Sequence, residues 1–253
     1  MSKLNYIFGL HAITSLLNVN PGAIQQLFID KKRQDKRIQD LMQRAKKLCM
    51  EITTTDTQQL DKLAGGGKHQ GIVAQCQMPQ PLNESTLDPM LEYPDHPLLF
   101  LVLDGVQDPH NLGACLRTAD AAGVDAVIIP RDRAVSLTST VIKVASGAAY
   151  TVPVISVTNL SRTMRYMQDA GVWFVGTDGA SSQSLYELEL TGSIAIVMGA
   201  EGSGLRRLTK EVCDYLVNLP MAGSVESLNV SVATGVCLYE VVRQREQKNH
   251  NNG

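Results

Sequence analysis

The sequence has no marked excess of charge of either sign, because 23 lysines and arginines stand against 25 aspartates and glutamates and leave a net charge of −2. Bulk charge therefore does not indicate a nucleic-acid-binding protein, and such a role must depend on a local patch. The sequence also lacks any apolar run approaching the ~18 residues of a membrane-spanning helix. The apolar stretch within residues 1–11 is too short for a signal peptide. We therefore expect a soluble protein of the cytoplasm.

Paired cysteines and metal-ligand spacings are also missing. The five cysteines are scattered and form no C-x-x-C pair, which favours buried thiols in a reducing compartment over disulfides or a zinc site. No cysteine has a context that would lower its pKa, so a covalent cysteine mechanism has no support. The five histidines show no metal-ligand spacing. We expect no metal in this protein.

Proline is concentrated in one place. Five of the ten prolines lie between residues 78 and 97. Because proline lacks an N–H and restrains the residue before it, this stretch should be extended and irregular, as an interdomain linker would be. With 253 residues, 44% of them hydrophobic, the chain can form two modest domains with real cores. We expect a first domain at residues 1–78, a linker at 79–97, a second domain at 98–245 and a polar tail at 246–253.

The first domain has a strongly basic segment. Apolar runs predict strands at residues 24–30 and 71–75, and helical spacing predicts a helix over 35–50, so we expect a small α/β fold. Residues 31–47 hold eight basic and two acidic residues, a net charge of +6 against −8 for the rest of the chain. An RNA phosphate footprint needs such a concentration, although a solvated helix face would have the same pattern. The RNA-binding candidates are Lys31, Lys32, Arg33, Lys36 and Arg37.

The second domain alternates apolar runs with helical patterns. Strands are expected at residues 98–103, 124–129, 152–157, 172–176, 193–198 and 215–219, and helices at 112–122, 136–145, 160–170, 204–213 and 228–243. This alternation implies a parallel sheet covered on both faces. Ligands of such sheets bind at the carboxyl ends of the strands. Three segments rich in glycine and polar residues begin there, so we expect one composite site.

The first of these segments spans residues 104–117. Asn111 is at the position expected of a helix N-cap. Gly113 would lie in the first turn, where a glycine costs ~1 kcal/mol relative to alanine and suggests that something approaches the backbone closely. Arg117 is four residues later and can lean back toward the helix start, where N–H groups and a cation suit an anion or phosphate. The alternative is an ordinary capped helix with a surface arginine.

The second segment spans residues 196–204, and its loop at 199–204 follows an apolar run. Its glycines would let a ligand press against backbone N–H and C=O groups, and Glu201 could orient that ligand. A dinucleotide-binding fingerprint is disfavoured, because the spacing is G-x-x-G-x-G and no acid ends the following strand. A glycine-rich turn that caps the helix after Gly204 is the alternative.

The third segment spans residues 219–231. Leu219 and Met221 would lie at a strand end, followed by a small polar loop and a helix start at Ser227, Leu228 and Asn229. Ser227 or Asn229 can cap that helix, which is the non-catalytic explanation for both. The helix carries an apolar stripe that is more typical of a core or an oligomer interface than of a cofactor site.

Together and in this order, the three segments resemble the signature motifs of the SpoU/TrmH family of RNA ribose 2′-O-methyltransferases. The resemblance spans residues 98–243, and the first domain with its proline-rich linker is similar to the family's substrate-binding extension. It implies an α/β domain of the SPOUT type, whose parallel sheet has a C-terminal part threaded into a trefoil knot, and an L30e-like first domain. It also implies a homodimer with the site at the subunit interface. Composition and periodicity could not have predicted a knot, which is among the rarest topologies.

The resemblance further implies a cofactor and a set of site residues. S-adenosylmethionine would bind in the knot against the second and third segments. The matching cofactor-binding positions are Gly199, Gly202, Leu219, Met221 and Leu228. The matching catalytic positions are Asn111, Arg117, Glu201, Ser227 and Asn229.

The implied reaction moves a methyl group from a sulfonium to a ribose hydroxyl, which requires alignment of oxygen, carbon and sulfur and removal of a proton. In this family the arginine matching Arg117 is often assigned as the base. A guanidinium is a poor proton acceptor, so we favour stabilisation of the developing alkoxide and contact with a phosphate. The implied substrate is a guanosine of large-subunit (23S) ribosomal RNA. Transfer RNA as the substrate, or a non-catalytic RNA-binding protein of the same fold, stay open as alternatives.

Overall fold

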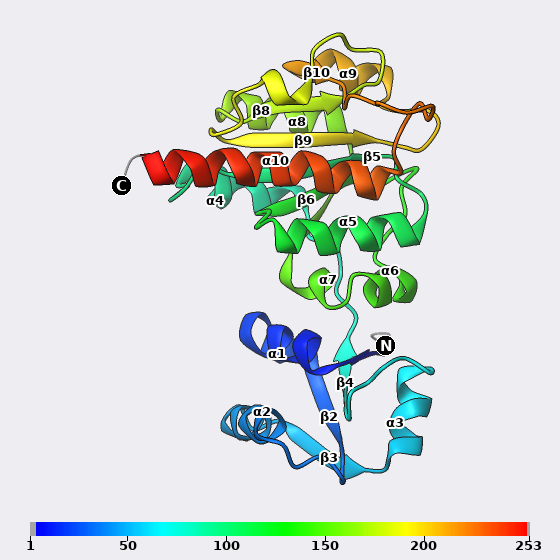
Figure 1. Ribbon diagram of the computed structural model, residues 1–253. Coiled ribbons are helices and arrows are strands. Elements are labelled where there is room, and N and C mark those ends of the chain that lie inside the picture. Colours follow the sequence, from blue (N-terminus) through cyan, green and yellow to red (C-terminus); the bar gives the residue numbers. More distant parts are fainter. Residues whose placement is uncertain (1–3, 252–253) are drawn as a thin grey trace. The chain divides into compact units, whose positions relative to one another are not determined.

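The structure, a computed structural model, describes the backbone of residues 4–251 (Figure 1). The chain divides into two units. The first comprises Met1–Gln80 together with Ser146–Thr151, and the second comprises Pro81–Ala145 together with Val152–Gly253. The domain limits expected from the sequence stay a prediction. None of the described helices has the length and apolar character that crossing a membrane requires.

The first unit is a four-stranded sheet with helices packed on it. Its strand order is β1-β4-β2-β3, with β2 parallel to β3 and β4 antiparallel to both β1 and β2. The strands are β1 (Leu4–Phe8), β2 (Ile24–Asp30), β3 (Glu51–Thr55) and β4 (Ile72–Gln77). The helices are α1 (Leu10–Val19), α2 (Lys36–Lys47), α3 (Thr57–Ala64) and α7 (Ala148–Thr151). The predicted elements at 24–30, 35–50 and 71–75 correspond to β2, α2 and β4.

Helix α7 belongs to this unit although it comes from the middle of the chain. It packs on α1, and Gly147, just before α7, lies against Ala12. A Cβ added to Gly147 would approach the Cβ of Ala12 to 3.3 Å, and its φ of 102° lies in the region that favours glycine. This contact therefore depends on a small residue on each side.

The proline-rich segment is not an irregular linker throughout, and this prediction is wrong for residues 82–92. Leu82 exchanges backbone hydrogen bonds with Val154 and Ser156 at 2.7 and 2.9 Å. A 3-10 turn (Glu84–Thr86) and helix α4 (Leu87–Glu92) follow, and Leu87 and Leu91 are buried in the core of the second unit. Pro89 lies in the first turn of α4, where a missing N–H removes no helical hydrogen bond. Pro89 is therefore compatible with a helix here.

The second unit is a six-stranded sheet in which every pair of neighbours is parallel, as expected. The strand order is β10-β8-β9-β5-β6-β7. The strands are β5 (Leu99–Asp104), β6 (Ala126–Pro130), β7 (Val154–Val157), β8 (Trp173–Thr177), β9 (Ile194–Gly199) and β10 (Tyr215–Val217). The helices besides α4 are α5 (Pro109–Ala121), α6 (Ser139–Val144), α8 (Leu160–Asp169), α9 (Arg207–Val212) and α10 (Val230–Asn251).

Helices cover both faces of this sheet, which is why its strands are almost wholly apolar. In Figure 1, α5 and α10 lie together in front of the sheet, and α4, α8 and α9 contribute to the core behind it. Alternate residues of each strand point to opposite faces, so Phe100 and Val102 of β5 join the α4, α8 and α9 core. The threading of the chain into a knot stays a prediction.

Two helix ends differ from expectation. Helix α5 begins at Pro109, and its N-cap is Asp108, whose side chain accepts a hydrogen bond from the His110 N–H at 2.9 Å. Asn111 is therefore inside the helix and not its cap. Helix α10 continues to Asn251, so the expected polar tail is helical over residues 246–251.

Candidate cofactor and catalytic site

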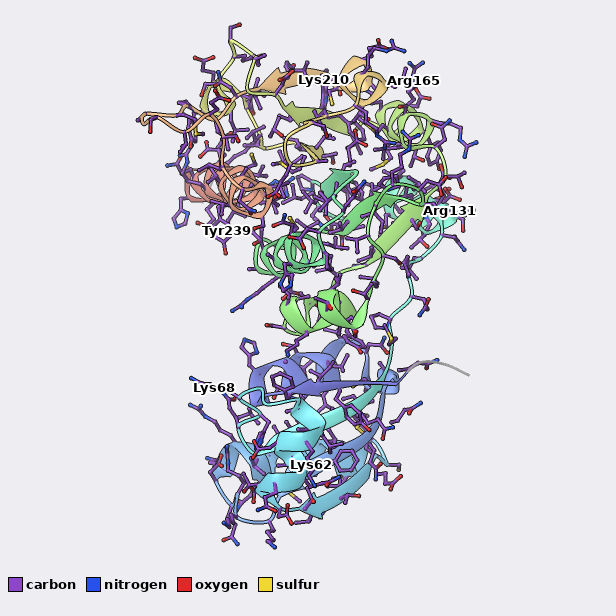
Figure 2. All side chains as sticks on the ribbon, turned by 90° about the vertical axis from the view of Figure 1, so that its right-hand side faces the viewer. Lys62, Lys68, Arg131, Arg165, Lys210 and Tyr239 are labelled. Carbon is purple, nitrogen blue, oxygen red and sulfur yellow. The ribbon has the colours of Figure 1, made fainter. Side chains whose placement is uncertain are left out.

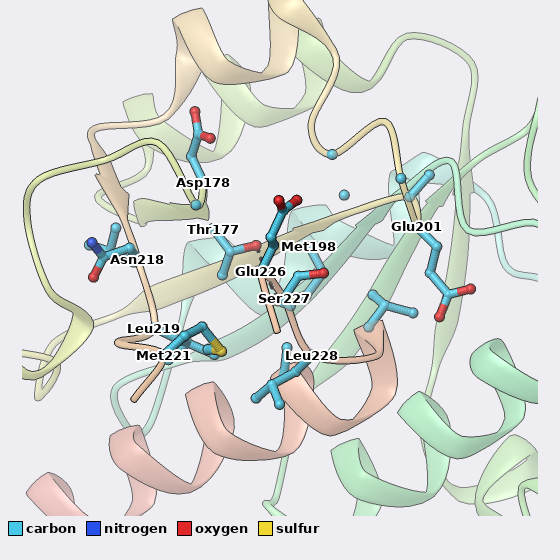
Figure 3. Close-up of a pocket in the computed structure, with 18 residues that line it drawn as sticks. Thr177, Asp178, Met198, Glu201, Asn218, Leu219, Met221, Glu226, Ser227 and Leu228 are labelled. Carbon is cyan, nitrogen blue, oxygen red and sulfur yellow. Dashed lines mark hydrogen bonds between the residues drawn. The ribbon is translucent and has the colours of Figure 1, made fainter. Parts of the chain in front are cut away.

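The carboxyl ends of β8, β9 and β10 and the start of α10 enclose a pocket, which we call the first pocket (Figure 3). All five expected cofactor-binding residues line it, and they come from the second and third sequence segments. Its lining is Thr177, Asp178, Gly179, Met198, Gly199, Ala200, Glu201, Gly202, Gly204, Val217, Asn218, Leu219, Met221, Glu226, Ser227, Leu228, Val230 and Ala233. The second and third segments therefore meet, as the sequence predicted.

One wall of the first pocket is a glycine-rich turn, residues 199–204, that two backbone hydrogen bonds close. The Ala200 N–H donates to the Gly204 carbonyl at 3.1 Å, and the Gly204 N–H donates to the Ala200 carbonyl at 2.9 Å. A Cβ on Gly199 would lie 2.1 Å from the carbonyl carbon of Gly204. Helix α9 begins only at Arg207, so the turn does not cap it. A glycine is needed at 199 because the backbone of Gly204 and Leu205 lies where a side chain would be. The sequence had suggested a ligand as the reason.

Asn229 joins all three segments. Its Oδ1 accepts a hydrogen bond from the Ser231 N–H at 2.9 Å, which caps the start of α10. Its Nδ2 donates to Asn111 Oδ1 at 3.0 Å and to Glu201 Oε1 at 2.6 Å. The capping function and the contact with the other two segments therefore belong to the same side chain. We call these three residues, Asn111, Glu201 and Asn229, the amide–carboxylate cluster.

A second pocket lies on the other side of this cluster. It is lined by Gly105, Val106, Gln107, Asp108, Asn111, Ala200, Glu201, Ser203 and Val230. The two pockets share Ala200, Glu201 and Val230, and Glu201 is the ionisable member of this shared set. A methyl donor in one pocket and an acceptor hydroxyl in the other would meet at Glu201.

The first pocket suits an apolar ligand that carries positive charge. Met198, Leu219, Met221 and Leu228 supply apolar surface, and Leu228 is 36% exposed although it is a large apolar side chain. Three carboxylates also line the pocket, those of Asp178, Glu201 and Glu226, whereas no lysine or arginine is among the lining residues. Glu226 and Ser227 lie between the Asp178 side and the Leu228 side in Figure 3. These residues fit a sulfonium cofactor, because its charge would offset the carboxylates.

Asp178 is the carboxylate whose charge is already balanced. It follows β8 directly and accepts a hydrogen bond from Lys210 Nζ at 2.6 Å. This hydrogen bond is the main reason that the pKa of Asp178 is lowered, against the opposing effect of burial. Sequence reasoning missed Asp178 and Glu226, although an acid directly after a strand, and an acid beside Ser227, were the signals that could have revealed them.

Arg117 is not brought to either pocket. It is exposed, whereas Gly113 is buried against α6, where an added Cβ would lie 2.6 Å from Val144 Cβ and 2.9 Å from the Val141 carbonyl oxygen. The close approach that Gly113 predicted is therefore made by a helix and not by a ligand. Ser227 lines the first pocket from an exposed position.

The remaining polar chemistry of the site is limited. Burial raises the pKa of the Cys115 thiol, which lies one helical turn after Asn111 on α5, to about 11. This thiol is therefore protonated at neutral pH and is not a nucleophile. Within residues 4–251, no group of three histidine, cysteine, aspartate or glutamate side chains could hold a metal ion.

In the first unit, the basic segment folds mostly as α2. Ile38 and Leu41 are buried, and the basic residues of the helix are exposed on its other side. Four of the five RNA-binding candidates, Lys31, Lys32, Lys36 and Arg37, are exposed. Arg33 is half-buried, and its Nε donates to Asp35 at 2.5 Å while another guanidinium N–H donates to the Gln70 carbonyl. Arg33 is therefore held by the protein itself.

Comparison with known proteins gives the same assignment for both parts of the chain. Residues 98–239 match the family described as SpoU rRNA Methylase, and residues 6–82 match the RNA 2′-O ribose methyltransferase substrate-binding family. The 23S rRNA (guanosine-2′-O-)-methyltransferase RlmB of Photobacterium profundum is 56% identical over 240 residues, which cover 95% of this chain and 98% of that protein. The protein of the same name from Vibrio cholerae is 55% identical over 239 residues, which cover 94% and 96%.

A solved structure shares the fold over nearly the whole chain. The SpoU methyltransferase AviRb from Streptomyces viridochromogenes, crystallised in complex with the cofactor AdoMet, superposes with a TM-score of 0.75 at 25% identity. The match covers 96% of this chain and 91% of that one.

Proposed function

Because the chain belongs to the SpoU rRNA methylase family, we propose that it transfers the methyl group of S-adenosylmethionine to the ribose 2′-hydroxyl of a guanosine in 23S ribosomal RNA. The observation that carries this proposal is the pair of pockets that meet at the amide–carboxylate cluster. The relatives' names supply the substrate, and an AdoMet-bound relative of the same fold supports the cofactor. Action on ribosomal RNA also agrees with the expected cytoplasmic location.

Each polar residue of the cluster then has a role that follows from its contacts. S-adenosylmethionine supplies a methyl group that is already activated by the positive sulfur. A bond forms between the ribose oxygen and the methyl carbon, the carbon–sulfur bond breaks, and the hydroxyl proton must leave. Glu201 is the ionisable residue common to both pockets, so its carboxylate is positioned to accept that proton. Asn111 acts through Asn229, whose Nδ2 it helps to orient toward Glu201.

The cofactor would be held by the walls of the first pocket. The turn after Gly199, together with Gly202, offers backbone groups without side chains in the way. Leu219, Met221 and Leu228 would cover the apolar parts of the ligand. Ser227, on the same wall as Leu228, would offer a hydroxyl to the reacting groups.

We infer that Arg117 acts on the site of a second copy of the chain. Helix α10 presents exposed apolar side chains at Val232 and Tyr239, which are 52% and 51% exposed. Gly235, between them, lies near Thr118 of α5, the neighbour of Arg117 along the chain. A homodimer formed across this face would cover the apolar residues and bring Arg117 toward the partner's site, where it would stabilise negative charge on the ribose oxygen.

Two measurements test the proposal. Nucleosides are analysed by mass spectrometry after incubation with S-adenosylmethionine and undermethylated 23S ribosomal RNA, with transfer RNA in parallel. New 2′-O-methylguanosine in the ribosomal sample alone is expected. Methylation of transfer RNA alone would overturn the substrate, and no product together with no cofactor binding would favour a non-catalytic RNA-binding protein.

The second measurement concerns Arg117. The substitution Arg117→Ala should abolish turnover and leave the dissociation constant for S-adenosylmethionine nearly unchanged, because Arg117 does not line the first pocket. Loss of cofactor affinity in this variant would contradict the role assigned to the arginine.

A further inference from the structure

The two units differ in the kind of positive charge that they carry. The first contains 11 basic and 6 acidic residues, a net charge of +5, and eight of its basic residues are lysines. The second contains 12 basic and 19 acidic residues, a net charge of −7, yet nine of its basic residues are arginines. Arginine binds phosphate through two parallel N–H groups, whereas lysine acts as a point charge. A cluster of arginines in the acidic unit would therefore indicate a phosphate-binding surface.

Four of these nine arginines lie along the carboxyl edge of the sheet, beyond β5, β6 and β7. They are Arg131, Arg133, Arg206 and Arg207, and we call them the arginine track. In Figure 1 the arrowhead of β9 points to the right, so Figure 2 looks onto this edge of the second unit. Figure 2 shows Arg131 on the side of the unit opposite Tyr239. A homodimer across α10 would therefore leave this side of the unit uncovered.

The track begins beside the second pocket. The Val135 N–H donates to the Val106 carbonyl at 3.0 Å, so the loop after β6 runs along the loop after β5. The carbonyl oxygen of Arg133 lies 3.6 Å from where a Cβ on Gly105 would be. Gly105 and Val106 both line the second pocket. Arg133 is thus next to the pocket where the acceptor ribose is proposed to bind.

The track continues across β6 and β7. The Arg131 N–H donates to the Val157 carbonyl at 2.8 Å, which places Arg131 where both strands end. The residues after β7, Thr158 and Asn159, line a third pocket together with Arg206 and Arg207. No acidic residue is among those that line this third pocket. Neighbouring strands are ~4.8 Å apart, so from β5 to β7 the track spans roughly 10 Å, the length of a few nucleotides.

The arginines of the track differ in how free they are. Arg206 is held by Asp104, whose side chain is fully buried at the end of β5, and Arg207 pairs with Glu211. Arg131 and Arg133 are exposed, and among the residues that the structure describes neither has a carboxylate partner. Arg133 also has a φ of 59°, a conformation that costs free energy for any residue except glycine. Neither the strained backbone of Arg133 nor its unpaired guanidinium stabilises the fold, so both indicate a role in binding.

We propose that the arginine track binds the sugar–phosphate backbone of the RNA strand next to the target nucleotide, held in single-stranded form from the second pocket to the third. This inference rests on the proposed function, since it takes the second pocket as the acceptor site. The track has the charge, the side-chain type and the continuity with that pocket which phosphate binding requires. The basic segment of the first unit, rich in lysine, would then attract RNA without aligning it.

The test uses the full chain, three single variants and the double variant that combines Arg133→Gly with Arg131→Gln. Arg133→Gly removes the guanidinium and also relieves the backbone strain, and Arg131→Gln removes the second unpaired guanidinium. Lys248→Gln is the matched control, because it removes one exposed positive charge that lies outside the track and donates to the Thr191 hydroxyl. Binding of a fluorescent single-stranded RNA dodecamer is measured over a range of salt concentrations, and S-adenosylmethionine binding is measured by calorimetry.

The expected result for Arg133→Gly is a change of stability and affinity in opposite directions. Its melting temperature should equal or exceed that of the unsubstituted chain, while its RNA affinity falls. A plot of log K against log salt has a negative slope, and each lost phosphate contact should make that slope less steep by ~0.7. The slope of the double variant should therefore be less steep by ~1.4. The KM for RNA should rise more than kcat falls, and cofactor affinity should not change.

Three outcomes would overturn the proposal. The first is an RNA affinity and a salt slope in the double variant that equal those of Lys248→Gln. The second is a fall in stability that accounts for the lost affinity, which would make the arginines structural. The third is an equal loss of binding for a duplex RNA of the same length, which would contradict a single-stranded track. The proposed function itself is judged separately, from whether the unsubstituted chain forms 2′-O-methylguanosine.

Discussion

The substitution Gly199→Ala should damage both folding and cofactor binding. The added Cβ would lie 2.1 Å from the carbonyl carbon of Gly204, 2.4 Å from the amide nitrogen of Leu205 and 2.5 Å from the Gly204 oxygen. All three are backbone atoms, so no side chain can rotate away, and the turn must move by more than 1 Å to reach an ordinary contact of about 3.5 Å. The turn can open only by weakening its two hydrogen bonds between Ala200 and Gly204.

The cost follows from these two effects. Forcing an extra carbon into a packed site costs typically ~1–3 kcal/mol, and two weakened hydrogen bonds add ~0.5–1.5 kcal/mol each. We expect a loss of roughly 2–6 kcal/mol in the free energy of unfolding, or on the order of 10 °C in melting temperature for a chain of this size. Cofactor affinity should fall as well, because the displaced turn forms one wall of the first pocket.

The same pocket provides the controls. Gly179 also lines it, but a Cβ there would meet no atom within 4 Å, so Gly179→Ala should change stability by less than about 0.5 kcal/mol. Gly202 has open space but a φ of 77°, so Gly202→Ala should cost only the ~1–2 kcal/mol of that conformation. Thermal unfolding and calorimetric titration with S-adenosylmethionine measure both quantities. If Gly199→Ala behaves like Gly179→Ala, the steric argument is refuted.

Three further predictions concern the same site and the thiols. Asn229→Asp keeps an oxygen to cap α10 but removes the two Nδ2 hydrogen bonds and places a second carboxylate beside Glu201, so the free energy of unfolding should fall by roughly 1–3 kcal/mol. Turnover should fall on the order of tenfold, about 1.4 kcal/mol, and unchanged turnover would contradict the role of the cluster. Asp178 has a pKa below its ordinary 3.8 because of Lys210, so the stability from this pair is present above that pH and is lost as the pH falls through the lower folded value. Between pH 5 and pH 2, the free energy of unfolding measured with urea should therefore fall more for the unsubstituted chain than for Asp178→Asn. An equal fall in both proteins would refute this. Cys49 is exposed and the pKa of each of the other four thiols is raised by burial to about 11 or 12, so a thiol reagent at pH 8 should label one cysteine quickly and four slowly; rapid labelling of more than one would show that the core opens.

Periodicity in the sequence was enough to predict most of the second unit, because a buried parallel strand is a continuous apolar run. The edge strand β3 escaped notice because its residues are partly exposed and its sequence, Glu-Ile-Thr-Thr-Thr, has no such run. The start of α5 was placed three residues late. Asp108 followed by Pro109 is itself a strong start signal, since aspartate caps well and proline suits the first helical position.

The site was predictable as a set of segments but not as a set of contacts. The sequence indicated that residues at three strand ends would converge, because carboxyl ends of parallel strands share one edge of the sheet. It could not indicate that Gly113 packs on Val144, or that Asn229 bonds both Asn111 and Glu201, because those partners are 28 to 118 residues apart along the chain. The position of Arg117, exposed and outside both pockets, was likewise not visible from helical spacing alone.

Helix α7 affects how this protein can be dissected in the laboratory. A fragment ending at Gln80 would contain every strand of the first sheet, yet it would lack Ser146–Thr151, which belong to the same unit. The side of α1 near Ala12 would then be exposed to solvent. A fragment of residues 81–253 would in turn carry those six residues without the partner on which they pack. A stable first unit would therefore require residues 146–151 to be grafted after residue 80. In a second unit made alone, this short segment would be better replaced by a turn of polar residues.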